Sequence, residues 1–316
     1  MPQTLAPPSN PRGDTGGSPA PAVPKNRPPD PELRALAERY GLSVSGARPS
    51  LPEYTRRLWA RRHFVTAFAT ARLTATYTTA RLGQAWQVVT PLLNAGVYYL
   101  IFGVLLRTSH GVPDFIPFLC AGIFFFTFTQ SAVLAGTRAI SGNLGLVRAL
   151  HFPRAALPLA ATLMQLQQLV FSMGALTVIV LVCGVPITWH WLLLIPTLLL
   201  QTVFNAGLAL IMARIGARST DISQLMPFVL RTWMYCSGVF YDLAAFTKNA
   251  PHAIAVLLDC NPALVYIDLA RYALLDSQRA HALPPYVWPL ALGWALVIGV
   301  GGYVFFWKAE ERYGRG

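Results

Sequence analysis

The chain has 316 residues, of which 54% are hydrophobic and 12% are charged, and its net charge is +12. Soluble domains carry roughly 25% charged residues, so this composition excludes an ordinary soluble enzyme and favours a membrane protein. The basic residues flank apolar runs and form no continuous basic face, which argues against a nucleic-acid partner and fits the positive-inside rule.

The N-terminal segment, residues 1–55, has ten prolines in its first 31 positions, mixed with glycine, serine and asparagine. Such a segment cannot bury enough apolar surface to fold alone, so it is predicted to be a disordered cytoplasmic tail. It contains no short apolar h-region, so no cleavable signal peptide is expected.

Residues 56–85 interleave aromatic and basic side chains immediately before the first apolar run. This pattern predicts an amphipathic helix in the headgroup region, with its arginines toward anionic lipid and its aromatic rings toward the acyl chains. An ordinary surface helix of a cytosolic domain is the alternative. The interfacial basic residues are Arg56, Arg57, Arg61, Arg62 and Arg72.

A six-span membrane domain is predicted over residues 86–310, followed by a short cytoplasmic tail at 311–316. Crossing about 30 Å of hydrocarbon takes roughly 20 apolar residues. A charge-free run at 155–213 is too long for one crossing, and the polar patch at 183–191 divides it in two. The predicted crossings lie within 82–106, 115–137, the two halves of 155–213, 220–241 and 286–307.

The segment between the last two crossings, residues 242–285, holds short apolar helices marked by Asp259, Asp268, Arg271 and Asp276. They are too short and too charged to cross lipid, so they are expected to be surface or re-entrant helices packed on the bundle. The expected fold class is therefore an all-α polytopic membrane protein.

The orientation follows from the loop charges. With the N-terminus inside, one side receives six Arg or Lys between residues 56 and 81 and eight more beyond them, whereas the other side receives four. Both termini are therefore predicted to be cytoplasmic.

One cytoplasmic loop contains the stretch LVRALHFPRAALPL, residues 146–159. Asn143 is a suitable N-cap for a short helix that Pro153 ends. Leu144, Val147 and residues 150–151 form an apolar stripe, with Arg148 on its flank. Such a helix could dock into a groove of a partner protein. Alternatively, it could rest on the lipid surface.

Three segments together resemble the permease subunits of type-2 ABC exporters, the family that exports polysaccharides, teichoic acids and O-antigens. They are YTTARLGQAWQVVTPLL at 77–93, LVRALHFPRAALPL at 146–159 and CNPALVYIDLARYALL at 260–275. Two positions depart from the family pattern. Thr78 replaces a basic residue, and Gly238 stands where the family often has proline.

The resemblance implies a transporter subunit that is not itself an enzyme. The chain has no G-x-x-x-x-G-K-[ST] motif, so ATP and Mg²⁺ are expected on a separate ATPase subunit. A second copy of the chain, residence in the bacterial cytoplasmic membrane and a polyprenyl-linked polymer as substrate are also implied. The residues expected to couple to the ATPase are Asn143, Leu144, Val147, Arg148, Leu150, His151, Phe152, Pro153 and Arg154.

Arg231 is a candidate for the substrate path. It lies about 16 Å into the predicted fifth crossing, where an arginine costs about 2.5–3.5 kcal/mol and should face the bundle interior or water. It could bind a diphosphate or pair within the bundle. Aromatic candidates for stacking on sugars are Tyr98, Tyr99, Phe102, Trp233, Phe240 and Tyr241, for which helix packing is the alternative role.

Two other functions compete with polymer export. An ABC exporter of drugs or small lipids would share the topology, and only the three motif segments argue against it. An integral-membrane glycosyl- or acyltransferase would need clustered catalytic groups, whereas the acids near the spans are scattered. The four cysteines lie far apart without C-x-x-C spacing, so no metal site is expected.

Overall fold

The computed structural model describes residues 39, 49–78, 81–106, 114–149, 152–219, 221–241, 251, 256, 258–279, 284 and 286–310. All regular elements among these residues are helices, which confirms the predicted all-α class. Apart from residue 39, they belong to one compact unit, Arg48–Gly316. The predicted N-terminal tail lies mostly outside the described residues.

Five helical segments of the described residues are long and apolar enough to cross a membrane, and each coincides with a predicted crossing. They are α4 (Trp86–Tyr98) with its π-helical continuation η2 (Tyr99–Leu105), α5 (Phe115–Thr137), α7 (Ala156–Val182), the turn η4 (Trp189–Leu193) with α8 (Leu194–Gly216), and α14 (Val287–Trp307). The break predicted at residues 183–191 separates α7 from η4.

The predicted fifth crossing is shorter than expected. Helix α9 (Asp221–Tyr235) has 15 residues, about 22 Å at 1.5 Å per residue, and the chain then turns at 236–241. Gly238 has a φ of 60° in this turn, a left-handed conformation that suits glycine and that proline, fixed near −65°, cannot adopt. The departure from the family's proline therefore marks the end of the helix, and the count of six crossings is not confirmed.

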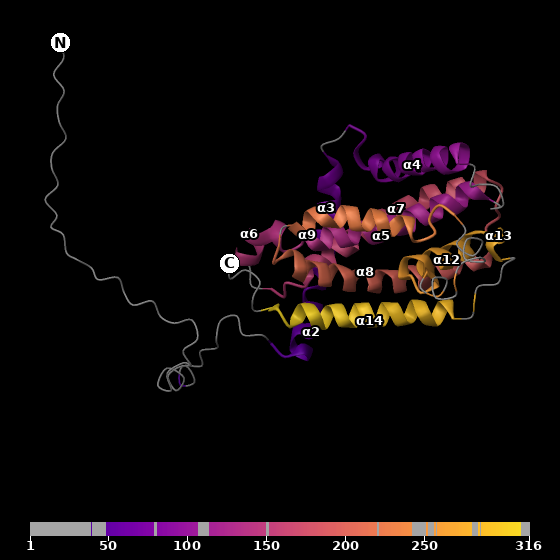
Figure 1. The fold of residues 1–316 in the computed structure, drawn as a ribbon. Helices are drawn as coiled ribbons and strands as arrows, with labels where there is room; N and C mark the ends of the chain where they lie inside the picture. The colour runs from indigo at the N-terminus through magenta and orange to yellow at the C-terminus, as the bar shows by residue number, and fades with distance from the viewer. Residues whose placement is uncertain are drawn as a thin grey trace, which may run out of the picture. The chain divides into compact units, whose positions relative to one another are not determined.

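The spanning helices run side by side with α9 packed along them, and most of the remaining elements gather at the two ends of this bundle (Figure 1). One end, here called the α6 end, holds α2 (Leu51–Ala60), α6 (Leu144–Ala149) and the end of α14, while α3 (Arg62–Thr78) runs across the spans. The opposite end, the α12 end, holds α12 (Pro262–Leu274) and α13 (Asp276–Arg279).

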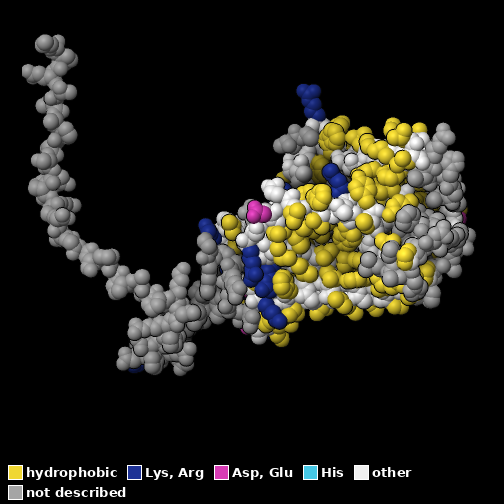
Figure 2. Space-filling view, in the orientation of Figure 1, with side chains coloured by type: hydrophobic (Ala, Val, Ile, Leu, Met, Phe, Trp, Pro, Cys, Tyr) yellow, Lys and Arg dark blue, Asp and Glu magenta, His cyan; other side chains and the backbone are white. Residues whose placement is uncertain are grey.

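The helices differ in how deeply they are embedded. Most of α5 is buried and forms the centre of the bundle, whereas α4 exposes most of its surface. Figure 2 shows apolar side chains over the flank of the bundle and a group of arginine and lysine side chains at the α6 end. An apolar flank bounded by basic residues is typical of a protein that sits in a bilayer.

Helices α8 and α14 approach each other at glycines. A Cβ atom on Gly207 would overlap the backbone of Ile298, and one on Gly302 would overlap the backbone of Gly207. Small residues allow such close backbone packing in lipid, where no hydrophobic force drives helices together. The two helices therefore behave as one packed pair.

We expect Gly207→Val to destabilise the purified protein by about 1–3 kcal/mol, as overpacking does elsewhere, and to lower its thermal midpoint. Gly174→Val is the matched control, because a Cβ atom at this α7 position meets nothing within 4 Å. Equal midpoints for the two variants would show that the close approach of α8 and α14 does not hold the fold together.

Candidate functional site

The stretch with the predicted docking pattern forms a short helix, α6, as predicted. The turn η3 (Ser141–Asn143) leads into α6, and α7 begins at Ala156. Asn143 does not cap α6. Its Nδ2 donates to the carbonyl oxygen of Ala139 at 2.8 Å, and its Oδ1 accepts from Nη1 of Arg72 at 3.2 Å. The side chain instead joins α3 to the end of α5.

The predicted apolar stripe is divided between two faces of α6. Val147 is 5% exposed and packs into the protein's own core with Ile140 and Ala155, so its assignment to a docking face is wrong. Leu144 and Arg148 remain exposed. Leu150 and His151 lie outside the described residues, and Leu144, Gly145 and Arg148 therefore form the described open face of the helix.

A buried carboxylate joins three distant parts of the chain at the α6 end. Glu310, three residues beyond α14, accepts a hydrogen bond from the hydroxyl of Tyr54 at 2.8 Å and one from the backbone N–H of Arg154 at 3.0 Å. The Arg154 guanidinium donates to the Glu310 backbone carbonyl, and the Ala155 N–H donates to the Tyr54 hydroxyl at 3.1 Å. We call Tyr54, Arg154, Ala155 and Glu310 the Glu310 cluster.

The Glu310 cluster ties residues 154–155, just before α7, to α2 and to the end of α14. It also satisfies two N–H groups at the start of α7 that have no partner within the helix. Sequence analysis missed Glu310, because a single acid after the last span gives no sign that its partner Tyr54 lies 256 positions earlier.

Helix α3 contacts Phe152, which follows α6, and Gln167 of α7. The rings of Phe64 and Phe152 lie 5.2 Å apart, and the Gln167 amide of α7 donates to Thr70 at 2.9 Å. Pro153 lies between Phe152 and the Glu310 cluster, whereas α6 ends earlier, at Ala149. The predicted basic residues Arg56, Arg57, Arg61, Arg62 and Arg72 are all exposed along α2, α3 and the junction between them.

The aromatic substrate-path candidates from α4 and from the turn after α9 form one cluster. The ring of Phe240 lies 4.7 Å from that of Tyr98 and 4.4 Å from that of Phe102, and Phe240 is fully buried. The Tyr241 hydroxyl donates to the Tyr235 carbonyl. Packing accounts for Phe240, whose side chain has no open surface within the single chain.

The other aromatic candidates lie apart from this cluster. Trp233 donates to Asn261 Oδ1 at 2.9 Å and packs edge-on against Phe126. Tyr99 stays 39% exposed beside Phe115. Trp233 is therefore tied to the bundle, whereas Tyr99 keeps an open surface.

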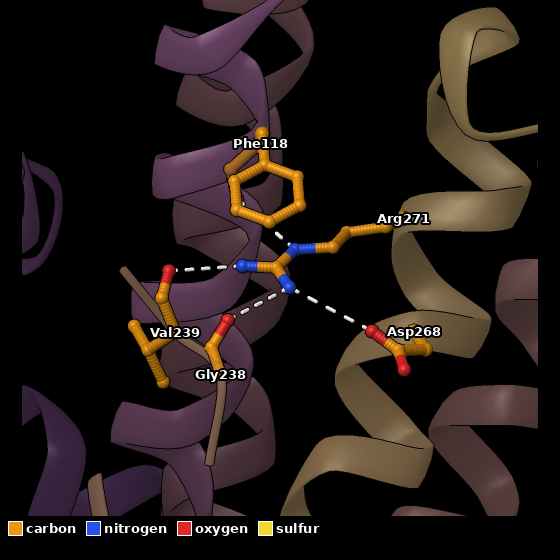
Figure 3. Close-up of polar contacts among 5 residues, drawn as sticks. All are labelled: Phe118, Gly238, Val239, Asp268 and Arg271. Atoms are coloured by element: carbon orange, nitrogen blue, oxygen red, sulfur yellow. Dashed lines mark hydrogen bonds and ion pairs between the residues drawn. The ribbon is translucent and has the colours of Figure 1, made fainter. Parts of the chain in front are cut away.

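The turn that carries Phe240 is held by Arg271 of α12, which the sequence analysis placed in a short helix between the last two predicted crossings (Figure 3). Its guanidinium is 2% exposed and donates to the carbonyl oxygens of Gly238 at 3.0 Å and Val239 at 2.9 Å. It also lies 3.3 Å from the centre of the Phe118 ring and 3.6 Å from Asp268. Arg271 therefore satisfies backbone carbonyls of a non-helical turn.

Asn261, ten residues before Arg271, holds the same turn. Its side-chain oxygen caps α12 through the Ala263 N–H, and its amide donates to Cys236 O and Ser237 Oγ, each at 3.1 Å. The Asn-Pro and Arg positions of the 260–275 segment thus have a structural role, which is to fasten α12 to the end of α9.

Arg231 places a charge among apolar side chains on the flank of the bundle. It is exposed on α9 between the exposed residues Phe228 and Tyr235. An arginine on an apolar face would have a cost if that face lay in lipid. Among the described residues, no group of three His, Cys, Asp or Glu side chains is placed to hold a metal ion.

Comparisons with known proteins agree with this arrangement. The sequence model of the family described as "ABC-2 type transporter" matches residues 64–275. The O-antigen export system permease protein RfbA of Myxococcus xanthus is 26% identical over 256 residues, which are 81% of this chain and 96% of the relative. A protein of the same name from Klebsiella pneumoniae is 25% identical over 59% of this chain and 70% of its own length.

The buried carboxyl of Glu310 predicts a pH dependence of stability. Burial raises its pKa above the ordinary value of 4.5, although hydrogen bonds from Arg154 and Tyr54 act in the opposite direction. The folded protein therefore holds this proton more tightly than the unfolded chain does. Consequently, the free energy of unfolding falls as pH rises from 4.5 through the raised pKa.

We expect Glu310→Gln to flatten this part of the profile when thermal midpoints are measured against pH. Glu53→Gln is the control, because this carboxylate is 39% exposed and pairs with Arg57 at the surface. It should keep the wild-type profile. If Glu310→Gln also kept that profile, the buried carboxyl would not be the titrating group.

Proposed function

Because this chain belongs to the ABC-2 type transporter family, we propose that it is the membrane permease of an ATP-driven exporter of a lipid-linked polysaccharide. The observation that carries the proposal is the family match over residues 64–275, which includes α6, α9 and the whole of α12. The relatives named O-antigen export permeases support an O-antigen-type polymer, with a teichoic-acid-type polymer as the related alternative.

A separate ATPase subunit would supply the energy, since the chain carries no P-loop of its own. The open face of α6 is the proposed contact. Movement of α6 would reach α2, α7 and α14 together, because the Glu310 cluster joins the start of α7 to the other two helices. The permease would therefore respond to ATP as connected rigid elements rather than through one loop.

The basic α6 end would face the cytoplasm of a bacterial cell, and both termini would lie on that side. The exposed arginines of α2 and α3 support this orientation. Helix α3, which runs across the spans, would lie in the headgroup layer (Figure 1).

A second copy of the chain would complete the pathway. Helix α9 exposes Arg231 together with apolar neighbours, and a water-filled channel between two copies would remove the cost of exposing this charge to lipid. Helix α9 and the turn after it would then form the sixth crossing. Tyr98 at the end of α4 and Tyr99 at the start of η2 would lie on the same pathway.

The proposal as a whole is tested in cells that lack this permease. Lipid-linked polymer should accumulate in the inner leaflet and reach the surface again when the wild-type chain is restored. Normal polymer export in the depleted cells, combined with failure to export a drug or a small lipid, would support the alternative exporter class instead.

The docking face is tested by Gly145→Trp. A Cβ atom at Gly145 meets nothing within 4 Å, so the large side chain leaves α6 intact but covers its open face. We expect co-purification of the ATPase to fall at least tenfold. Gly293→Trp in α14, equally open, should leave it unchanged. Full recovery of the ATPase with Gly145→Trp would place the docking surface elsewhere.

The role of Arg231 is tested by Arg231→Ala. We expect polymer export to fall at least tenfold while the amount of assembled complex stays at the wild-type level, because the residue faces the proposed channel and not the core. Arg218→Ala, an exposed arginine just after α8, serves as the control. Wild-type export by Arg231→Ala would remove the residue from the substrate path.

A further inference from the structure

Two cavities lie one above the other between α5 and α7 and share Gln165. The first, about 260 Å³, opens beside α3 at the α6 end and is lined by Arg72, Arg138 and Asn143; we call it the basic cavity. The second, about 160 Å³, lies deeper along the same two helices and beside α4; we call it the polar cavity.

The basic cavity concentrates positive charge. Arg72 of α3 and Arg138 at the end of α5 both line this cavity. Oδ1 of Asn143 accepts a hydrogen bond from Nη1 of Arg72 at 3.2 Å. The ion pairs seen in the described residues, Arg57 with Glu53 and Arg271 with Asp268, involve neither arginine. Two guanidinium groups around one space favour an anion, and their planar donor sets match the oxygens of a phosphate.

The polar cavity carries no charge but is rich in hydrogen-bonding groups. Its polar lining comes from Thr90 and Asn94 of α4, Thr127 and Ser131 of α5, and Gln165 and Gln168 of α7. Hydroxyl and amide groups at this depth suit a small ligand part with several hydroxyls, because a hydrocarbon tail would leave them unpaired.

A buried side chain next to the polar cavity also lacks hydrogen-bond partners among the described residues. Gln87 of α4 is 1% exposed, and both atoms of its side-chain amide lack a hydrogen-bond partner among the described residues. Its backbone carbonyl accepts a hydrogen bond from Ser172, which lines the polar cavity. Buried amides without partners are rare in folded proteins and commonly indicate a missing water or ligand.

We propose that the two cavities form one site for the phosphorylated headgroup of a lipid. The phosphate binds Arg72 and Arg138, and the hydroxyl-bearing group attached to it occupies the polar cavity beyond Gln165. The apolar wall of the basic cavity, from Leu134, Leu157 and Met164, faces the start of the lipid tail. The site lies within a single copy of the chain, beside α3.

This inference rests on the proposed function in one respect, the source of the headgroup. In a polysaccharide exporter, the ligand is the diphosphate and first sugar of the lipid-linked polymer. An anionic membrane lipid such as phosphatidylglycerol carries the same chemistry, a phosphate next to hydroxyl groups. The polar cavity holds the hydroxyl-bearing part of the ligand deeper in the bundle than the phosphate. This position favours the exported lipid as the ligand, because export requires the sugars to move toward the membrane interior.

The site is tested by equilibrium binding to the full-length permease in phosphatidylcholine nanodiscs, with a fluorescent polyprenyl diphosphoryl sugar as the probe. We expect Arg72→Gln and Arg138→Gln each to weaken binding at least tenfold. The control Arg218→Gln, an exposed arginine outside both cavities, should bind like wild type. Thermal midpoints of all variants establish that each is folded.

A second variant separates the two cavities. Gln165→Leu should weaken binding of the sugar-bearing probe but leave binding of polyprenyl diphosphate without a sugar unchanged. Displacement of the probe by an equal concentration of phosphatidylglycerol would assign the site to membrane lipid. Wild-type affinity in both arginine variants would overturn the inference, and normal polymer export by wild-type cells would then still leave the proposed function standing.

Discussion

The absence of water from hydrocarbon is the constraint on which this structure depends. Helices satisfy their own backbone groups, but every helix end or turn at membrane depth needs partners supplied by the protein. Arg271 and Asn261 supply them for the turn after α9, by donating to carbonyls of residues 236, 238 and 239. At the opposite end, Glu310 and Tyr54 accept the first N–H groups of the α7 region. The protein has few charged side chains, and the four polar side chains named here form hydrogen bonds with backbone groups where helices begin or end.

The length of apolar runs explains why much of the fold could be predicted from the sequence. A charge-free run of the right length has few alternatives to a spanning helix, so five crossings and the break at residues 183–191 agree with prediction. The end of α9 could not be predicted in this way. Its apolar sequence continues past Tyr235, and only the left-handed Gly238 shows that the chain turns.

The site was less predictable, because its residues depend on contacts that are distant in sequence. The spacing of apolar residues in α6 identified an apolar stripe, but it did not show which side of the helix faces the bundle. Val147 packs in one buried cluster with Tyr54 and Ile140, which belong to other parts of the chain. Glu310 belongs to no motif, and no spacing in the sequence gave the contacts of Glu310 or Arg271. Their partners, Tyr54 and Phe118, lie 256 and 153 positions away. Only the resemblance of the 260–275 segment to known permeases indicated that Arg271 matters.

The glycine contacts between α8 and α14 have a consequence for how such a permease changes shape. Backbones that touch directly leave no side-chain layer that could slide, so these two helices form a fixed pair. Helix α4 has few buried side chains and continues into a π-helical segment. In the proposed exporter, α4 would therefore be the wall that shifts against this fixed pair, because it is the least buried of the five candidate spans.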